Sequence, residues 1–137
     1  MSPEPRRVEL TELTRFDRKF FEGAERFTYI GEGKLGGKAQ GLANIDRFLA
    51  EHFDQTRFPQ LEVSIPTLTV ITTQMFDKFM EQNDLYEVAL SERRDDQLAL
   101  AFQQADLPAE LVGDLRALIT KVKQPLAVRS SSLAEDA

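Results

Sequence analysis

The sequence predicts an α/β fold, and three observations support this class. Short segments rich in β-branched and aromatic residues occur at 26–30 and 68–71, and a short apolar run at 125–128 predicts a third strand. They alternate with longer segments in which apolar residues recur at spacings of three and four, as on one face of a helix. Chains that alternate strands and helices in this way build a sheet flanked by helices.

The first third of the chain predicts an arm, a strand, a loop and a helix, in that order. Residues 1–25 are expected to form an N-terminal arm, since the first thirteen contain two prolines and no clear apolar period. Residues 26–30 predict a strand, and the four glycines within 31–37 predict a loop. Residues 38–53 predict a helix. Its expected apolar face consists of Leu42, Ile45, Leu49 and Phe53.

The middle of the chain predicts a second strand followed directly by a helix. The strand covers residues 68–71, and Thr72 or Thr73 can cap the helix through a side-chain oxygen. The apolar face of this helix is expected to contain Met75, Phe76, Phe79 and Met80.

The last third predicts two further helical segments and a third strand. Residues 84–105 are expected to be helical with an interruption near 91–96, where polar residues gather. Pro108 suits the first turn of the next helix, because its missing N–H would have no intrahelical partner there. Residues 125–128 predict a strand that runs into Arg129 and three serines.

The composition excludes several classes of protein. With 42% hydrophobic and 29% charged residues, the chain is typical of globular domains, and no run approaches the ~18 apolar residues of a membrane span. The N-terminus has no apolar secretory segment, so we expect a cytoplasmic protein without a membrane partner. The absence of cysteine excludes disulfides and thiolate catalysis. A net charge of −6 makes nucleic acid an unexpected partner, because phosphate neutralisation needs cations.

The glycine-rich loop and the start of the next helix form the first candidate binding site. Backbone N–H groups at a helix start lack intrahelical partners and carry partial positive charge, so they can hold an anion. Lys38 would place an ammonium on the same anion, and Gly36 and Gly37 would let it approach the backbone closely. The alternative interpretation is a plain tight turn before a helix.

Two known glycine motifs can be compared with this loop. Gly31, Gly33 and Gly36 match the spacing of the dinucleotide fingerprint. That fold also needs a second strand ending in an acid about 20 residues on, and the stretch DQTRFPQ after Phe53 predicts no strand. The P-loop pattern fails as well, because Ala39 replaces the Ser or Thr whose hydroxyl binds Mg²⁺.

The second candidate segment lies where the third expected strand ends. Arg129 would present a planar guanidinium, which can donate two parallel hydrogen bonds to a phosphate. Ser130 and Ser131 would add small donors at the same place. The alternative interpretation is a surface arginine followed by a serine loop.

Three motifs together resemble a known family. They are GGKAQGLANI at 36–45, IPTLTVITTQMF at 65–76 and LAVRSSSLAED at 126–136. In this order they resemble the N-terminal nucleotide-binding region of the phosphoenolpyruvate synthase and pyruvate phosphate dikinase family. Residues 26–137 are therefore expected to form a partial ATP-binding domain, truncated at its C-terminus. Residues 1–25 add nothing to the resemblance.

The resemblance implies an ATP-grasp-like domain with a mixed sheet. It implies that Lys38 and Arg129 contact the phosphates of ATP. Possible supporting residues are Gly36, Gly37, Ser130 and Ser131.

The resemblance also implies a phosphotransferase that moves a phosphoryl group from ATP, via a histidine outside this chain, to pyruvate or a similar acceptor. No catalytic residue and no metal ligand is expected in these 137 residues. The ligands of Mg²⁺ are expected in the remaining domains of a parent enzyme. The chain alone is therefore expected to be inactive.

A stand-alone, non-catalytic α/β interaction module is the alternative function. The short chain favours this interpretation, and the excess of acidic residues within 51–137 would then form the partner surface. The single histidine, His52, lies in the helix expected at 38–53. We expect it to be a partly buried structural residue and not a phosphocarrier.

Overall fold

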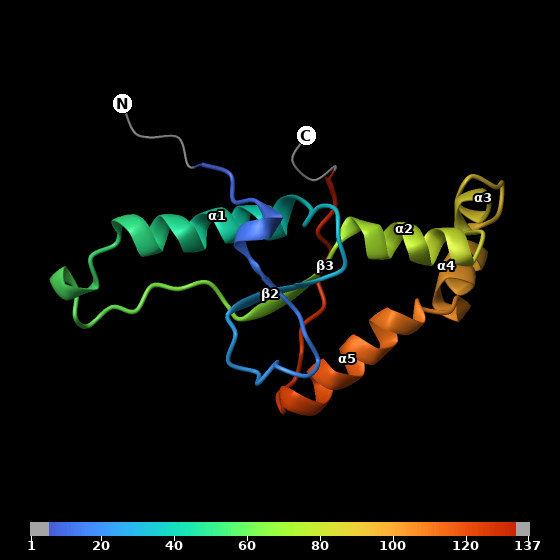
Figure 1. The fold of residues 1–137 in the computed structure, drawn as a ribbon. Helices are drawn as coiled ribbons and strands as arrows, with labels where there is room; N and C mark the ends of the chain where they lie inside the picture. The colour runs from blue at the N-terminus through green and yellow to red at the C-terminus, as the bar shows by residue number, and fades with distance from the viewer. Residues whose placement is uncertain (1–5, 134–137) are drawn as a thin grey trace.

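A computed structural model describes residues 6–133, and its centre is a three-stranded parallel sheet flanked by helices (Figure 1). This architecture confirms the predicted α/β class. The strands lie in the order β1-β2-β3. Their bounds are Thr14–Arg15 for β1, Phe27–Ile30 for β2 and Leu68–Ile71 for β3.

The make-up of the sheet corrects the expectation in two respects. Residues 125–128 form no strand, and the third strand is instead β1, from the expected arm. The described strands are all parallel, where a mixed sheet was expected. Strand propensity reflects packing on a half-buried pleated surface, and Val128, which is 94% exposed, has no such surface to pack against.

Strand β2 presents alternate side chains to two cores, and β3 contributes to the first of them. Phe27 and Val70 are buried in the core beneath helix α1 (Gly37–His52), together with Val8 and Leu35. Ile30, on the opposite face of β2, is buried in the second core, against α5. This alternation follows from the period of two along a strand, and it places a helical layer on each face of the sheet.

Helix α1 packs on the sheet through small residues, which corrects its expected apolar face. Its buried residues are Gly37, Ala39 and Ala43. Ile45, expected to be buried, is 51% exposed. Small residues let the helix backbone approach the strands closely, while Leu42 of the expected face packs against this core and is only partly buried. His52 is exposed and not partly buried, and its ring stacks on Phe48 with centroids 4.5 Å apart.

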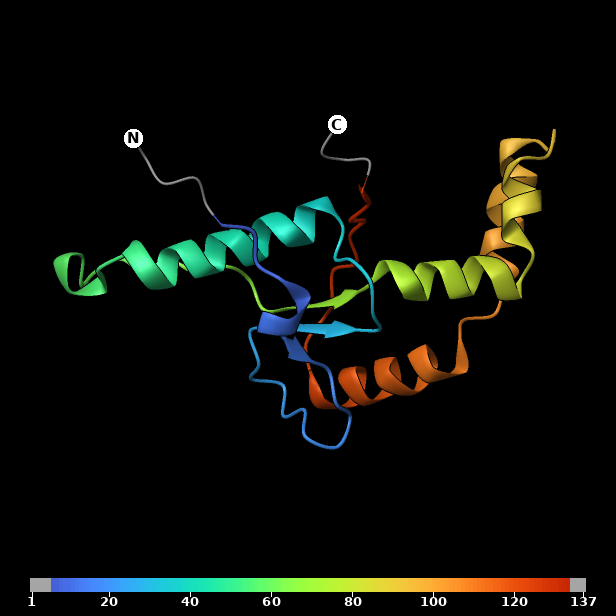
Figure 2. The ribbon, with the colours of Figure 1, turned by 45° about the horizontal axis from the view of Figure 1, so that its top comes forward.

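The remaining helices extend from one end of the sheet and return to it (Figures 1 and 2). Helix α2 follows β3 directly, α3 and α4 lie together at its far end, and α5 returns beneath the sheet. None of the helices within residues 6–133 is long and apolar enough to cross a membrane. The helical bounds are α2 Thr73–Gln82, α3 Leu85–Ala89, α4 Asp95–Gln104 and α5 Ala109–Lys121, with short 3₁₀ turns at Leu10–Glu12 and Gln55–Arg57.

The described part of the expected arm, residues 6–25, packs against the rest of the fold. Val8 is buried beneath α1, and its backbone N–H donates to the side chain of Asn44. Phe16 and Phe21 are buried against α5, with ring centroids 4.7 Å apart. This segment therefore contributes a strand and side chains to both cores, although the sequence of residues 1–13 shows no clear apolar period.

A carboxylate joins this N-terminal segment to α1. The guanidinium of Arg47 lies 2.9 Å from Oε1 of Glu12, and the other oxygen of Glu12 accepts the backbone N–H of Glu9. The hydrogen bond from Glu9 and the neighbouring Arg47 lower the pKa of Glu12. The ionised carboxylate is thus favoured in the folded chain.

This lowered pKa predicts a loss of stability in acid. The ionised carboxylate of Glu12 stabilises the folded chain fully at pH values above its pKa in the unfolded chain, about 4.3. This stabilisation is lost as the pH falls through the lower pKa of Glu12 in the folded chain. Thermal melts between about pH 7 and about pH 3 should show a smaller acid-induced loss for Glu12→Gln than for the wild type. Glu62→Gln, at an exposed site outside this cluster, should behave as the wild type. Equal acid sensitivity of Glu12→Gln and the wild type would contradict the prediction.

Candidate functional site

The glycine loop, residues 31–36, begins at the carboxyl end of β2. The neighbouring strand β3 ends at the same edge and leads directly into α2. Crevices outside the carboxyl ends of parallel strands are the usual binding sites of open α/β sheets. The loop that the sequence singled out therefore lies at the edge where a ligand is expected.

The start of α2 holds the glycine loop through paired hydrogen bonds. The N–H of Thr73 donates to the carbonyl of Lys34 at 2.9 Å, and the N–H of Lys34 donates to the Thr73 hydroxyl at 3.0 Å. The N–H of Glu32 donates to the side-chain oxygen of Gln74 at 3.0 Å. Thr72 is the N-cap residue, yet its buried hydroxyl makes no capping bond and has no partner in the described structure. The loop thus takes over the capping role that the sequence assigned to a threonine side chain.

The serine segment, residues 129–132, docks on the first turn of α1. The hydroxyl of Ser131 accepts the N–H of Ala39 at 3.0 Å and donates to the carbonyl of Leu35 at 3.2 Å. The carbonyl of Ser132 accepts the N–H of Gly37 at 2.9 Å. The chain after α5 runs back past the sheet to reach this position (Figures 1 and 2). The fold therefore brings together the two candidate segments, which lie far apart in the sequence.

Gly36 makes this close approach possible. Its φ of 81° lies in the left-handed region, which side-chain-bearing residues rarely adopt. A Cβ at this position would overlap the carbonyl oxygen of Ser131. Position 36 consequently admits only glycine while the serine segment is docked.

The docked segment changes what the helix start offers to an anion. The N–H groups of Gly37 and Ala39 were expected to be unpaired, but Ser132 and Ser131 already accept their hydrogen bonds. The reason lies in the return of the chain after α5, which supplies an intramolecular cap. Any anion at this edge must rely on side-chain cations more than on those two amides.

The two predicted cations, Lys38 and Arg129, flank the docking contact. Lys38 is exposed and stands between Gly37 and Ala39, both of which bond to the serine segment. Arg129 is exposed and precedes Ser131 by two residues. Exposed long cationic side chains at one contact can reach an anion from either side.

The dinucleotide fingerprint requires a parallel strand-helix-strand unit with an acidic residue after its second strand. Strand β2, the glycine loop, α1 and β3 do form a parallel strand-helix-strand unit, although the residues directly after Phe53 form no strand. The fingerprint needs an acidic residue at the end of the second strand, where this chain has Thr72. The dinucleotide interpretation therefore still lacks a required residue.

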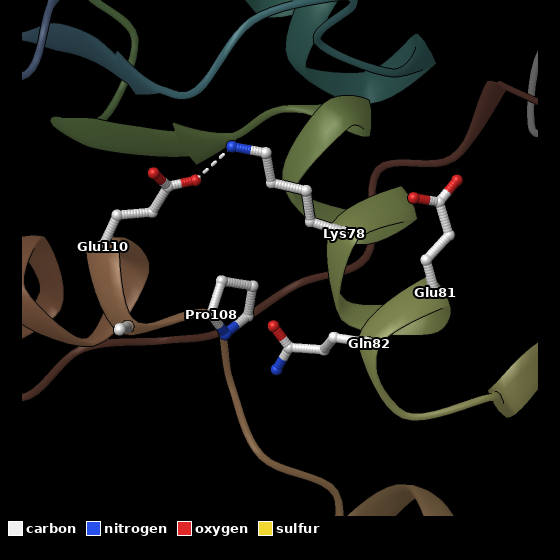
Figure 3. A pocket seen from close by; sticks show the side chains of 6 residues that line it. Lys78, Glu81, Gln82, Pro108 and Glu110 are labelled. Atoms are coloured by element: carbon white, nitrogen blue, oxygen red, sulfur yellow. Dashed lines mark hydrogen bonds and ion pairs between the residues drawn. The ribbon is translucent and has the colours of Figure 1, made fainter.

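A separate open hollow lies between α2 and the start of α5 (Figure 3). The ammonium of Lys78 points toward the carboxylate of Glu110 and forms an ion pair with it. The hollow shares no residue with the glycine loop or the serine segment, and its lysine is paired, so we assign no anion site here. Its lining consists of Lys78, Glu81, Gln82, Pro108, Ala109 and Glu110.

The described residues also bear on the metal ion that the resemblance implies. Between residues 6 and 133, no three His, Cys, Asp or Glu side chains cluster in a way that could hold a metal ion. The described residues therefore supply no protein-only site for Mg²⁺, which nucleotide sites hold with one or two carboxylates together with the phosphates. Residues 134–136 of the third motif lie outside the described part of the chain.

One comparison with known proteins identifies a family. A family model described as "Pyruvate phosphate dikinase, AMP/ATP-binding domain" matches residues 32–137, which contain Lys38, Arg129 and most of the glycine loop. No curated protein and no solved structure gave a significant match. The family match confirms the resemblance that the three short motifs indicated.

Proposed function

Because this chain belongs to the family of pyruvate phosphate dikinase AMP/ATP-binding domains, we propose that it is the ATP-binding part of a phosphoenolpyruvate synthase- or pyruvate phosphate dikinase-like phosphotransferase. The observation that carries this proposal is the docking of the segment bearing Arg129 on the helical turn bearing Lys38. A shared phosphate site requires positions 38 and 129 to be neighbours in space. Their separation in the sequence does not by itself bring them together.

In this proposal Lys38 and Arg129 bind the phosphates of ATP. Lys38 supplies a compact point charge, and Arg129 supplies a planar fork that can bind two phosphate oxygens at once. Both would neutralise charge as it redistributes, which is how proteins chiefly assist phosphoryl transfer. Gly36, Gly37, Ser130 and Ser131 would support the site.

The chemical step itself is proposed to need groups outside these residues. A phosphoryl group would pass from ATP to a histidine elsewhere in a parent enzyme, and then to pyruvate or a similar acceptor. His52 is not proposed as this carrier, because it stacks on Phe48 at the end of α1 opposite the docking contact. We propose that the chain alone binds ATP without turning it over.

Equilibrium binding of ATP to the purified chain tests this function. We expect the wild type to bind ATP and Lys38→Ala to bind roughly tenfold more weakly, since a charge-assisted contact contributes about 1.5–3 kcal/mol before solvent screening. Lys34→Ala is the matched control. Its backbone holds α2 while its side chain is exposed, so its affinity should stay near that of the wild type.

Two results would count against the proposal. Wild-type affinity in Lys38→Ala would remove this lysine from the phosphate site. Failure of the folded wild type to bind ATP at all would favour the alternative, a non-catalytic interaction module. A thermal melt of each variant separates loss of binding from loss of folding.

A further inference from the structure

We propose that Ser131 is a positioning residue of the nucleotide site: it clamps the serine segment onto α1 and thereby places Arg129 beside Lys38. This inference rests on the proposed function. It adds a specific role for a side chain that the sequence suggested only as a possible supporting group.

The hydrogen-bonding capacity of Ser131 supports a role inside the protein. A hydroxyl has a single proton to donate, and that of Ser131 goes to the carbonyl of Leu35. One of its lone pairs accepts the N–H of Ala39. A phosphate oxygen accepts hydrogen bonds and therefore needs a donor. The only donor of the Ser131 side chain is already bonded to the carbonyl of Leu35. In the docked arrangement the hydroxyl therefore links two parts of the chain and does not contact a phosphate.

The segment that carries Arg129 gains little from packing. Residues 123–130 are exposed throughout and form no strand, and Val128 is 94% exposed. Hydrogen bonds of Ser131 and Ser132 to the first turn of α1 and to Leu35 before it therefore contribute strongly to the placement of this segment. Gly36 adds shape to the contact, because only its missing Cβ leaves room for the carbonyl of Ser131.

This placement matters for ATP affinity because each group that becomes ordered on binding loses conformational entropy, and that loss weakens the binding. An arginine on an undocked segment would lose backbone as well as side-chain freedom when it meets ATP. A docked segment loses mainly the side-chain freedom of Arg129. Removal of the Ser131 hydroxyl should therefore weaken ATP binding through Arg129, without loss of any contact to the nucleotide.

A double-mutant cycle in the purified chain tests this dependence. We expect Ser131→Ala to lower the affinity for ATP about tenfold, as for the loss of one or two hydrogen bonds. Ser131→Ala added to Arg129→Ala should cause no further loss, because the arginine through which Ser131 acts is already absent. Ser132→Ala is the matched control. The side chain of Ser132 is exposed, and this residue contacts α1 through its backbone carbonyl, which the substitution retains.

Amide hydrogen exchange measures the docking without nucleotide. The N–H of Ala39 lies in the first turn, where no helical carbonyl can accept it, and Ser131 is its acceptor. Its exchange should accelerate about tenfold or more in Ser131→Ala and stay unchanged in Ser132→Ala. Amides of α5 should exchange at the wild-type rate in both variants, which shows that the fold persists.

The outcomes separate this inference from the function on which it rests. Unchanged Ala39 exchange in Ser131→Ala would overturn the clamp. Faster exchange with wild-type ATP affinity, or equal losses in the presence and absence of Arg129, would overturn the positioning role alone. Wild-type affinity in Arg129→Ala, or no ATP binding by the folded wild type, would overturn the proposed function and with it the positioning role.

Discussion

Replacement of Gly36 by alanine is expected to undock the serine segment and to lower the free energy of unfolding by about 3 kcal/mol. The backbone at φ 81° and ψ 162° lies in a region that is essentially restricted to glycine and costs a residue with a Cβ roughly 1–3 kcal/mol. The Cβ would also overlap the carbonyl of Ser131, so the segment must move away. That movement removes the hydrogen bonds to Gly37 and Ala39, each of which contributes about 0.5–1.5 kcal/mol net.

Gly41→Ala provides a control within the same helix. Gly41 lies in the interior of α1, and a Cβ there would meet nothing within 4 Å. Alanine should therefore raise the free energy of unfolding by about 0.5–1 kcal/mol, through its higher helix propensity. Urea unfolding of both variants measures the contrast. Equal stability of Gly36→Ala and Gly41→Ala would show that the serine segment does not depend on the missing side chain at position 36.

The parts of the fold with a strong local pattern could be predicted from the sequence. The strands expected at 26–30 and 68–71 appear as Phe27–Ile30 and Leu68–Ile71, because each has β-branched or aromatic residues beside turn-forming neighbours. The helix expected at 38–53 appears as Gly37–His52 for a similar local reason, namely its apolar period after a glycine loop.

The parts that depend on tertiary context could not be predicted. Strand β1, Thr14–Arg15, is too short to show any periodicity, and it exists because β2 lies beside it. Residues 125–128 are apolar in sequence but lie exposed outside the sheet, since no sheet surface receives them. For α1, hydrophobicity favoured the face with Ile45, whereas close packing on the sheet selected the face with Ala39 and Ala43.

The candidate site divides in the same way. Lys38 and Arg129 could be selected from the sequence as candidates, because cations beside glycines and serines are typical of phosphate sites. The contact between Ser131 and the N–H of Ala39 could not be selected, because it depends on the path of the chain between them. The hydrogen bond that the Thr73 hydroxyl accepts from Lys34 in the glycine loop could not be predicted either. A threonine at the start of a helix suggests a cap for its own helix.

The arginine of the serine segment gives the second large expected effect. Arg129→Lys retains the charge and removes the planar fork, so its ATP affinity should fall about tenfold if the arginine binds phosphate bidentately. Arg129→Ala removes the charge as well and should lower the affinity up to about a hundredfold, at ~1.4 kcal/mol per decade. Isothermal titration at matched ionic strength measures the series, because screening weakens exposed charge contacts.

Nucleotide length and a second arginine sharpen this prediction. ATP offers a phosphate chain and AMP a single phosphate, so the loss in Arg129→Ala should be greater for ATP than for AMP if the arginine recognises the chain. Arg93→Ala changes an exposed arginine in the connection between α3 and α4, at the far end of α2 from the glycine loop, and should leave both affinities unchanged (Figure 1). Equal small losses in Arg129→Ala and Arg93→Ala would mean that both act only through net charge. Arg129 would then be a surface residue, and the docked serine segment would serve the fold alone.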